Sequence, residues 1–310
     1  MVKSINLYNN LKIKKQDKGS ILLIGNFDGV HLGHQKLFRL AKIYKKKYSL
    51  RIGVLTFEPM PKMYFDNSLK NFRISNQNQK INLLKNLDVD FIISKKFNKL
   101  FSKTKSINFI KEILKKKLGA KFIFVSNNFR FGYKREGDVK QLIEYENKLK
   151  FKIIKPKPLL IKKKIISSSL IRNYLQLGKL AEVNKLLNRN WSIEGKVQKG
   201  KQLGKKIGFP TANIDIKNYV LARPGVYAVK VKILKNKNYF KGIANLGYRP
   251  TFKGKKILLE VHLFNFSGNL YNKYLSVDFL KFIRKEKKFK NVDQLKTQIQ
   301  TDLMIAKKTK

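Results

Sequence analysis

The sequence predicts a two-domain protein, with an α/β domain on a doubly wound parallel sheet at residues 1–187 and a smaller antiparallel β-barrel domain with a C-terminal helix at residues 188–310. Three observations lead to this fold class. Strand and helix patterns alternate in the first part. Short strand-like segments separated by Gly and Pro follow in the second. A chain of 310 residues with 43% apolar side chains suffices for two hydrophobic cores.

The first domain is predicted from the alternation of two periodicities. Short apolar runs predict strands, and the segments between them have the apolar spacing of amphipathic helices. The predicted strands are 20–25, 51–57, 89–94, 121–126 and 151–155, and the predicted helices are 33–46, 78–87, 106–118 and 139–149. Ligands of such sheets bind at the carboxyl ends of the strands, so the loops there are the first candidates for a site.

The second domain is predicted from a change of character after Leu187. The helical pattern that ends there gives way to short strand-like segments with turn residues between them. The predicted strands are 191–196, 225–234, 239–246, 256–264 and 275–283, followed by a helix at 292–307. Antiparallel strands with this turn punctuation favour a small closed barrel.

A glycine-rich turn follows the first predicted strand and precedes the first predicted helix. It runs from Gly25 to His34 and contains two histidines three residues apart, His31 and His34. Free backbone N–H groups and the helix dipole attract anions at a helix N-terminus, so the turn predicts a phosphate site. The alternatives are a metal pair and two surface histidines. A metal pair lacks a ready third ligand, since the sequence has no Cys and one further His, His262.

This turn resembles the G-x-F-D-G-x-H-x-G-H signature of nucleotidylyltransferases, in the form found in prokaryotic bifunctional riboflavin kinase/FAD synthetases. The resemblance implies a Rossmann-like nucleotidylyltransferase domain in which the turn binds ATP. His31 and His34 are implied as catalytic residues. The residues implied for ATP binding are Gly25, Phe27, Asp28, Gly29 and Gly33.

A second element of the same superfamily is present at residues 166–172, whose sequence Ile-Ser-Ser-Ser-Leu-Ile-Arg resembles I-S-S-T-x-I-R. Ser169 replaces the usual Thr and keeps the hydroxyl. The resemblance implies that Ser168 and Ser169 bind the triphosphate and that Arg172 is a catalytic residue. Without the resemblance, serines at the start of a helix would be interpreted as ordinary N-cap residues.

A third loop follows the fourth predicted strand, where residues 128–132 are Asn-Phe-Arg-Phe-Gly. In the family this element, followed by Gly-Asp as here, shapes the flavin and adenosine pockets. Asn128 and Arg130 are therefore implied as binding residues, and the aromatic rings suit stacking on a planar ligand. The alternative is that at least one of Phe129 and Phe131 fills the core.

The second domain begins with glycines at positions 195, 200, 204 and 208, followed by Phe-Pro-Thr-Ala-Asn. This series resembles the flavokinase motif G-x3-G-R-x-x-G-F-P-T-A-N, with Lys205 where Arg is common. Glycines at these intervals let a loop close over phosphates with its N–H groups, and no P-loop sequence is present. The resemblance implies that Thr211 and Asn213 hold Mg²⁺. The residues implied for nucleotide binding are Gly200, Gly204, Gly208, Pro210 and Asn213.

Glu260 lies in Leu-Glu-Val-His-Leu, which resembles the L-E-V-H-L strand of flavokinases. In that family the Glu is the proposed general base. A carboxylate on an otherwise apolar strand is costly unless it is paired or functional. The alternative is that Glu260 and His262 occupy the polar face of an alternating strand. We favour catalysis by Glu260 and regard His262 as a neighbour.

Together these motifs cover the chain from Gly25 to about Ala306 and imply two activities. The barrel would phosphorylate riboflavin to FMN, with Glu260 accepting the proton of the ribityl 5′-hydroxyl. The first domain would transfer the adenylyl group of ATP to FMN, which gives FAD and pyrophosphate. ATP is the co-substrate of both reactions, and Mg²⁺ is the expected metal. The alternative is that only one of the two activities is retained.

The formal net charge of +51 suggests nucleic-acid binding, yet only ten of the 70 basic residues are Arg. The lysines are scattered along the chain and form no stripe interleaved with aromatic residues. We expect most of them to be solvated and expect no specific nucleic-acid partner. A basic nucleic-acid-binding protein on this fold is the alternative.

Three further features of the sequence indicate the cellular compartment of the protein. The chain has no Cys, its first residues have no apolar core of a signal peptide, and nowhere do 18 apolar residues run together. We therefore expect a cytoplasmic protein with no membrane partner. The sequence does not determine the oligomeric state, for which we favour a monomer.

Overall fold

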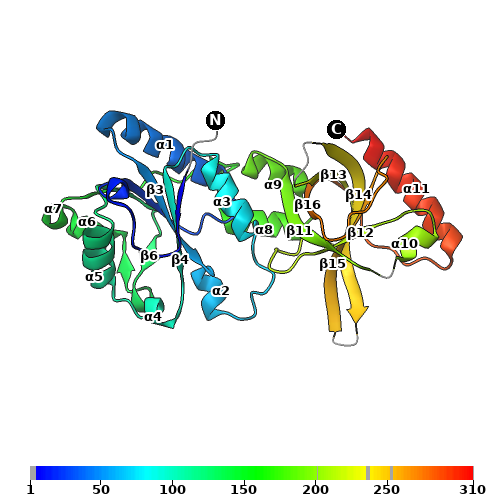
Figure 1. Ribbon diagram of the computed structural model, residues 1–310, viewed down its shortest axis with the longest axis horizontal. Helices are drawn as coiled ribbons and strands as arrows, with labels where there is room; N and C mark the ends of the chain where they lie inside the picture. The colour runs from blue at the N-terminus through cyan, green and yellow to red at the C-terminus, as the bar shows by residue number, and fades with distance from the viewer. Residues whose placement is uncertain (1–4, 201, 235–237, 252–253, 310) are drawn as a thin grey trace. The chain divides into compact units, whose positions relative to one another are not determined.

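The computed structural model describes residues 5–200, 202–234, 238–251 and 254–309, which form two compact units (Figure 1). The first unit contains the chain up to Leu69 together with Gln77–Ser167, and the second contains Lys70–Asn76 together with the chain from Ser168 onward. This division by packing differs from the predicted boundary after residue 187. The predicted boundary separates functions, and it stays a prediction.

The first unit is built on a six-stranded sheet with the order β1-β4-β3-β2-β5-β8. Its strands are β1 (Asn6–Tyr8), β2 (Ile21–Ile24), β3 (Ile52–Glu58), β4 (Phe91–Lys96), β5 (Phe122–Phe124) and β8 (Lys152–Ile154). All of these strands pair in parallel. Every residue of β2 is buried, as expected for the central strand of a sheet covered on both faces.

Helices pack on both faces of this sheet, which confirms the predicted doubly wound α/β fold. They are α1 (Leu32–Tyr48), α2 (Pro61–Phe65), α3 (Gln77–Lys85), α4 (Lys99–Ser102), α5 (Ser106–Asn108), α6 (Val139–Glu144) and α7 (Glu146–Leu149). Alternate residues of β2 point to opposite faces. Ile21 packs in one core cluster with Phe38 of α1, whereas Leu22 packs in another with Ile110.

Short elements complete the first unit. They are the 3₁₀ turns η1 (Lys15–Asp17) and η3 (Tyr133–Arg135), the π-helix η2 (Phe109–Lys117), and the strand pairs β6 (Arg130–Phe131) with β7 (Gly137–Asp138) and β9 (Leu160–Ile161) with β10 (Lys164–Ile165). The single helix predicted at 106–118 is thus α5 continued by η2. The π-helix has the same amphipathic pattern, so the sequence does not separate the two.

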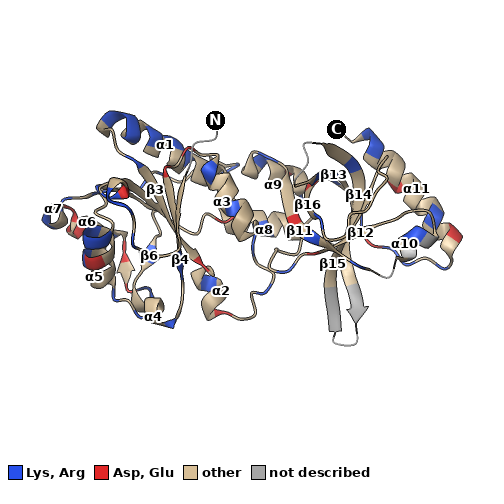
Figure 2. Cartoon of the chain, in the orientation of Figure 1, with Lys and Arg blue, Asp and Glu red and all other residues tan. Residues whose placement is uncertain are grey.

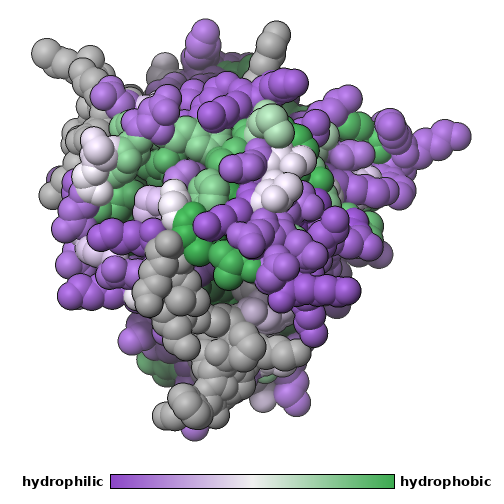
Figure 3. Space-filling model, turned by 90° about the vertical axis from the view of Figure 1, so that its right-hand side faces the viewer, coloured by the Kyte–Doolittle hydropathy of each residue, from purple (hydrophilic) through white to green (hydrophobic). Residues whose placement is uncertain are grey.

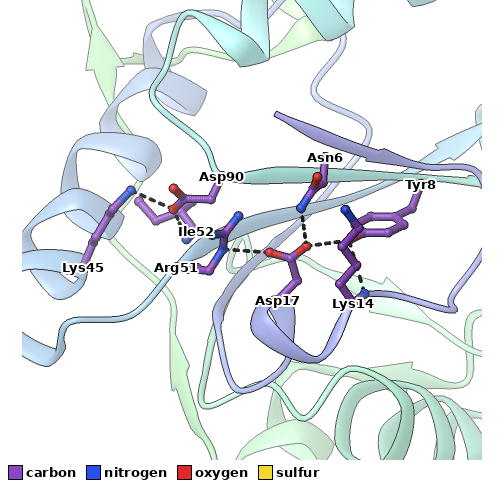
Figure 4. A network of polar contacts seen from close by, with 8 residues as sticks. All are labelled: Asn6, Tyr8, Lys14, Asp17, Lys45, Arg51, Ile52 and Asp90. Carbon is purple, nitrogen blue, oxygen red and sulfur yellow. Dashed lines mark hydrogen bonds and ion pairs between the residues drawn. The ribbon is translucent and has the colours of Figure 1, made fainter. Parts of the chain in front are cut away.

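Two buried carboxylates form polar contacts with this sheet, Asp17 with the edge strand β1 and Asp90 with the first residue of β3 (Figure 4). Asp17 is fully buried, accepts a hydrogen bond from Asn6 of β1 at 2.9 Å and pairs with Arg51 Nε at 2.7 Å. Asp90 pairs with Lys45 Nζ of α1 at 2.7 Å. The strand β1 is absent from the sequence prediction, because three residues carry little periodicity. It is held in the sheet by parallel pairing with β4, and Asn6 adds the contact with Asp17.

The second unit contains a closed barrel with the strand order β11-β12-β15-β14-β13-β16, which confirms the predicted barrel. Its strands are β11 (Trp191–Gln198), β12 (Ala212–Asp215), β13 (Gly225–Ile233), β14 (Tyr239–Thr251), β15 (Gly254–Leu263) and β16 (Tyr274–Arg284), and all pair antiparallel. Its helices are α8 (Ser168–Gln176), α9 (Leu180–Leu187), α10 (Leu203–Lys206) and α11 (Val292–Lys308). Strand β12 is missing from the prediction, because it lies inside the motif interpreted as a loop.

Trp191 anchors the core of this unit. It is 1% exposed, and its ring lies 4.7 Å from that of Phe279, centroid to centroid. Its indole N–H donates to the carbonyl oxygen of Ile74 at 2.9 Å, which ties the segment Lys70–Asn76 to the barrel unit. Helix α11 lies against β13, β14 and β16 and buries Ala306 there (Figure 1).

Basic side chains are spread over the helices and strands of both units (Figure 2). This distribution agrees with the expectation of a generally solvated lysine surface. Within the described ranges, no helix is long and apolar enough to cross a membrane.

Candidate active sites

The strand order places the histidine turn where the winding of the first sheet reverses. Strands β3 and β4 lie on one side of β2, and β5 and β8 lie on the other. Ligands of doubly wound sheets bind outside the carboxyl ends of the strands at such a point. The turn 25–31 follows β2 and the loop 126–129 follows β5, so both belong to this edge of the sheet.

The histidine turn has backbone conformations that L-residues rarely adopt. The φ angle is +49° at Phe27, +77° at Gly29 and +40° at Val30. Such a conformation costs on the order of 1–3 kcal/mol for a non-Gly residue, and Val is β-branched. Phe27 and Val30 are each 2% exposed and Asp28 is 3% exposed, so burial holds the turn in this shape. Strained backbone of this kind is typical of ligand-binding turns.

His31 and His34 lie against each other at the start of α1. Their rings stack with centroids 3.7 Å apart and an interplanar angle of 19°. His31 is the N-cap, and its Nδ1 accepts a hydrogen bond from the backbone N–H of His34 at 3.4 Å. The proton of neutral His31 is therefore on Nε2. Burial first, and His31 second, lower the pKa of His34 well below its usual value, so His34 is neutral at pH 7.

Gly25 and Gly33 occupy positions where a side chain would meet its neighbours. A Cβ atom on Gly33 would lie 3.1 Å from the ring of His31 and 3.3 Å from the carbonyl oxygen of Ile166. A Cβ atom on Gly25 would lie 3.3 Å from the ring of Phe27. The close approach of Gly33 to Ile166 brings the start of the serine motif to the N-terminus of α1.

Ser168, Ser169 and Arg172 lie in the first two turns of α8, which belongs to the second compact unit. The guanidinium of Arg172 stacks on the ring of Phe72 at 3.6 Å, and its Nε donates to the carbonyl oxygen of Phe72 at 2.7 Å. These contacts attach α8 to the segment Lys70–Asn76. The predicted role of the three residues at the triphosphate stays a prediction.

The loop after β5 borders a cavity of about 120 Å³ with aromatic walls. Its aromatic residues include Phe57, Phe65, Phe97, Phe101, Phe129 and Phe131. Phe131 is 7% exposed and belongs to the core, and Phe129 stacks on it with ring centroids 5.5 Å apart. The alternative that one phenylalanine of this loop fills the core is thus confirmed for Phe131.

Arg130 and Asn128, the two predicted binding residues of this loop, are exposed and have polar partners. Asn128 Oδ1 accepts from Ser126 Oγ at 2.9 Å. Arg130 Nη1 lies 3.1 Å from Asp138 Oδ2, and Asp138 also caps α6 by accepting from the backbone N–H of Gln141. That backbone hydrogen bond, and to a smaller extent Arg130, lower the pKa of Asp138. Arg130 is thereby held at the aromatic cavity, which it lines.

The barrel unit contains a larger cavity, of about 580 Å³, that brings several predicted kinase residues together. Its residues from the kinase motif and from β15 include Gly204, Thr211, Asn213, Glu260 and His262. Its apolar residues come from the barrel and from α11, and include Val226, Ile243, Val292, Leu295 and Ile299. On the face of this unit shown in Figure 3, apolar side chains gather and hydrophilic ones frame them. A mainly apolar cavity with a few polar groups is the usual form of a small-molecule site.

Strand register aligns Asn213, Glu260 and Asn245 in one row. Asn213 of β12 and Asn245 of β14 each lie directly opposite Glu260 of β15. Residues opposite each other on antiparallel strands share a face, and all three line the cavity. Thr211 and His262, each two residues from a member of this row, line it too. Asn245 has no role in the sequence-based prediction, because only the pairing of β14 with β15 brings it beside Glu260.

The glycines of the kinase motif are required for two different reasons. Gly208 has a φ angle of +91° and open space beside it, so the backbone conformation requires glycine. A Cβ atom on Gly204 would lie 2.3 Å from the carbonyl oxygen of Phe209, and one on Gly200 would lie 2.1 Å from Asn213 Nδ2. These two glycines let the backbone approach the cavity residues closely.

Pro210 and His262 connect this motif with β15. His262 Nδ1 lies 2.8 Å from the carbonyl oxygen of Pro210, which is hydrogen-bond distance. The ring of Phe209 meets that of His262 edge-on, at 6.0 Å between centroids. His262 thus has a packing partner and a polar partner in the loop, as expected for a neighbour of Glu260.

Thr211 and Asn213 fit the predicted Mg²⁺. Asn213 is 7% exposed, and its buried Oδ1 has no hydrogen-bond partner among the described residues. A buried acceptor without a partner costs about 1–3 kcal/mol, which a ligand or cation would offset. Hydroxyl, amide and carboxylate oxygens suit Mg²⁺, which usually shares its coordination with substrate phosphates. The described part of the chain holds no group of three His, Asp or Glu side chains suited to a metal.

Helix α11 and the end of β16 also border the cavity, although the sequence identified this part only as a terminal helix. Arg284 Nε lies 3.0 and 2.9 Å from the two carboxylate oxygens of Asp302, and Nη2 lies 2.8 Å from one of them. Asp302 is 1% exposed and also accepts from Gln298. This buried pair attaches α11 to the barrel beside the cavity, which both residues line.

Residues 13–170 match the family described as FAD synthetase, and residues 187–310 match the riboflavin kinase family. The chain is 44% identical over 301 residues to a bifunctional riboflavin kinase/FMN adenylyltransferase of Buchnera aphidicola subsp. Schizaphis graminum, with 96% of each chain covered. This chain belongs to the bifunctional riboflavin kinase/FMN adenylyltransferase family. It is also 37% identical over 306 residues to the protein of that name from Escherichia coli K12, covering 99% of this chain and 97% of that one.

The fold of the whole chain has a counterpart among solved structures. A crystal structure described as a macrolide-efflux protein from Streptococcus pneumoniae superposes with a TM-score of 0.86 at 29% identity and covers 100% of both chains. Within the bifunctional riboflavin kinase/FMN adenylyltransferase family, the histidine turn falls in the FAD synthetase match. The cavity of the barrel unit falls in the riboflavin kinase match.

Proposed function

We propose that this chain makes FAD in two steps, phosphorylating riboflavin to FMN in the barrel unit and adenylylating FMN at the histidine turn. The observation that carries the proposal is the row of Asn213, Glu260 and Asn245 in one cavity of about 580 Å³. Membership of the family supports both steps.

In the first step the ribityl 5′-hydroxyl of riboflavin attacks the γ-phosphorus of ATP, a new O–P bond forms and ADP leaves. Glu260 accepts the hydroxyl proton as general base. The apolar residues of the cavity suit the isoalloxazine ring, while the polar row suits the ribityl chain and phosphates. Bound Mg²⁺, held by Thr211 and Asn213, would neutralise charge on the transferred phosphoryl group.

In the second step a phosphate oxygen of FMN attacks the α-phosphorus of ATP, and pyrophosphate leaves. The nucleophile arrives ionised and needs no base. His31, His34 and the N–H groups at the start of α1 stabilise negative charge on the phosphates. The low pKa of His34 agrees with hydrogen bonding by a neutral ring. Ser168, Ser169 and Arg172 bind the triphosphate.

The flavin of the second step lies at the loop that carries Asn128 and Arg130. The neighbouring aromatic cavity, at about 120 Å³, accommodates one edge of a flavin ring system. Phe129 offers that edge a stacking surface, since it packs on the core at Phe131 with its ring nearly parallel. Arg130 is held in place by Asp138 at the same cavity.

We further propose a monomeric cytoplasmic enzyme whose partners are riboflavin, FMN and ATP, with no specific nucleic-acid or membrane partner. The lining of the kinase cavity comes from one chain, so the proposed kinase step needs no second subunit. The spread of basic side chains over both units supports general solvation over a nucleic-acid interface (Figure 2).

Incubation of the protein with riboflavin, ATP and Mg²⁺, followed by chromatography of the flavins, tests the proposal. FMN and then FAD are expected, with ADP and pyrophosphate as co-products. FMN without FAD would show that the adenylylation step is lost. FAD from supplied FMN, but no FMN from riboflavin, would show loss of the kinase step. Absence of any flavin turnover would reject the proposed function.

The double variant His31→Ala with His34→Ala tests the assignment of the two steps to two sites. Loss of a preorganised donor costs about 2.7–4 kcal/mol of transition-state stabilisation, so FAD formation should become undetectable. Phosphorylation of riboflavin should be unchanged and serves as the control for the barrel unit, while far-UV circular dichroism reports folding of the first unit. A folded double variant that loses both activities equally contradicts the assignment.

A further inference from the structure

A buried polar series connects α3 with the histidine turn. Lys80 of α3 is 2% exposed, and its Nζ donates to Thr56 Oγ1 at 3.1 Å. Thr56, near the carboxyl end of β3, is 0% exposed, and its hydroxyl donates to the backbone carbonyl oxygen of Asn26 at 3.4 Å. A cation on a helix is thus linked through one hydroxyl to the backbone of the turn that carries His31 and His34.

The chemistry of Lys80 determines how the Thr56 hydroxyl is oriented. An ammonium group has donors only, so Thr56 Oγ1 is the acceptor in that contact. The single hydroxyl proton of Thr56 is then available for the Asn26 carbonyl oxygen. Replacing Lys80 by an uncharged side chain would leave the hydroxyl free to rotate, so the contact with the turn depends on the lysine.

Burial of Lys80 is not explained by packing of α3 alone. Leu84 on the same helix is 0% exposed and packs in the core, so the helix has an apolar anchor. Burying an ammonium group is costly, and apolar residues of similar size often stabilise a protein as well or better. The carboxylate of Glu58 lies 4.0 Å from Lys80 Nζ and is itself 23% exposed, so this ion pair is long and partly solvated. A cation buried in contact with Thr56 at this edge of the sheet is in a position to serve the site.

The turn needs to be held, because its backbone is strained. Phe27, Gly29 and Val30 all have φ angles in the left-handed region, within a stretch of four residues. Asn26 immediately precedes this segment, and its carbonyl oxygen is the group that Thr56 contacts. A hydrogen bond at this point opposes relaxation of the strained backbone.

We propose that Lys80 and Thr56 are positioning residues for the adenylylation of FMN. Lys80 orients the Thr56 hydroxyl, the hydroxyl fixes the carbonyl of Asn26, and the turn then presents His31 and His34 to the phosphates of ATP. The inference rests on the proposed FMN adenylyltransferase activity. Neither residue is proposed to touch the substrate.

The test compares four variants by steady-state kinetics of FAD formation from FMN, ATP and Mg²⁺. Thr56→Val removes the hydroxyl at nearly constant shape, Thr56→Ser keeps it, and Lys80→Met removes the cation. Lys85→Met is the matched control, because it removes one positive charge from the same helix without touching the series. Riboflavin phosphorylation by each variant reports on the rest of the chain.

Displacing a catalytic group by about 1 Å costs up to roughly 100-fold in rate, so Thr56→Val and Lys80→Met should lower kcat/KM for ATP by roughly tenfold to 100-fold. The KM for FMN and the rate of riboflavin phosphorylation should stay unchanged. Thr56→Ser should restore kcat/KM for ATP, and Lys85→Met should behave as wild type. This pattern would support a positioning role, since a loss of folded first unit, which far-UV circular dichroism of each variant would detect, would lower kcat for FAD formation without being specific to ATP.

Several outcomes would overturn the inference. A folded Thr56→Val variant with the wild-type kcat/KM for ATP excludes the hydroxyl as the link, even if Lys80→Met is impaired. A parallel fall in riboflavin phosphorylation shows a general structural defect and equally rejects a positioning role. If Lys80→Met does not fold, the pair Thr56→Val and Thr56→Ser decides alone. Wild-type protein that forms no FAD from FMN rejects the proposed function instead, so the two failures are distinguishable.

Discussion

At the scale of single residues, the proposed kinase chemistry depends most on Glu260. Asn213 and Asn245 lie opposite it on the two neighbouring strands, so amide groups border the carboxylate on both sides. Glu260→Gln keeps the shape and the hydrogen-bonding capacity but cannot accept a proton. FMN formation should fall by about 10²–10⁴-fold, the usual contribution of a general base. Chromatographic assay of FMN from riboflavin measures this, and FAD formation from supplied FMN is the control.

A Glu260→Gln variant that phosphorylates riboflavin within a few-fold of wild type would exclude the carboxylate as general base. The loose transition state of phosphoryl transfer would then need little help from one. Loss of both activities would point to a folding defect, which circular dichroism of the variant would reveal.

His34 makes the stability of the first unit depend on pH. Its pKa is lowered well below the usual value of about 6.5 by burial and by His31. Below pH 6.5 the unfolded chain binds a proton at His34 that the folded chain does not bind. The free energy of unfolding should therefore fall as the pH decreases from about 6.5, by up to about 1.4 kcal/mol per pH unit from this group.

Urea unfolding followed by far-UV circular dichroism between pH 5 and 7.5 checks this prediction, with His34→Gln as the comparison. The variant should lose less stability on acidification than wild type, because Gln does not titrate. Identical pH slopes for the two proteins would show that His34 does not carry the effect.

At the scale of elements, the buried pair Arg284–Asp302 determines how α11 is attached to the barrel. Asp302 is 1% exposed and binds the guanidinium through both oxygens. Removing one partner leaves the other charge buried, so Arg284→Met should lower the free energy of unfolding by about 3–5 kcal/mol. Trp191, the only Trp of the chain, lies in the same unit, and its fluorescence during urea unfolding reports the change.

The double variant Arg284→Met with Asp302→Leu is the control for this ion pair. It removes both charges, so no unpaired charge stays buried. The double variant should therefore lose less stability than Arg284→Met alone, although it carries one substitution more. If Asp302→Leu lowers the free energy of unfolding by the same amount in the Arg284→Met background as in wild type, the two residues act independently.

At the scale of the whole molecule, the compact units predict where the chain can be cut. Helix α9 buries Val183, Leu186 and Leu187 beside the barrel. Asn184 of the same helix accepts from the backbone N–H of Trp191 at 2.8 Å and donates to the carbonyl oxygen of Phe279. The segment 168–187 therefore stabilises the barrel, even though the predicted functional boundary lies after it.

A fragment of residues 168–310 should consequently be more stable than one of residues 188–310. Burial of one large apolar side chain contributes about 1.5–3 kcal/mol, so the difference should be at least roughly 3 kcal/mol. Thermal unfolding followed by Trp191 fluorescence gives the midpoint of unfolding of each fragment. Neither fragment contains the segment 70–76, so its absence does not contribute to the difference. Both fragments, if folded, should phosphorylate riboflavin. Equal midpoints of unfolding would show that α9 does not support the barrel.

Much of the fold could be predicted because periodicity is local information. The strands of the sheet with four or more residues, and helix α1, follow directly from apolar spacing. The two-residue strands β6, β7, β9 and β10 are absent from the sequence prediction. So are β1, because Asn-Leu-Tyr is not an apolar run, and β12, because it lies inside the motif interpreted as a loop. Both are held by partners far along the chain, β1 by parallel pairing with β4 and β12 by pairing with β11 and β15.

The residues of the candidate sites also divide into those that are neighbours in sequence and those that only packing brings together. His31 and His34 could be found together because they lie one turn apart at a helix start, and their ring stacking agrees. Lys80, Asn245 and Asp302 have no role in the sequence-based prediction, although Asn245 and Asp302 line the barrel cavity and Lys80 contacts Thr56. Their neighbours there come from other elements, so no short sequence window contains the signal.

The sequence by itself determined the residue types, the order of most elements and the motifs that predict two nucleotide sites, because these depend on neighbours a few positions apart. Only the tertiary structure decided which side chains meet. Closure of the barrel sets Asn213 and Asn245 on either side of Glu260. Packing of α3 on the sheet buries Lys80 beside Thr56. Pairing across strands and burial of charge are long-range effects, and they exist only once distant segments are packed together.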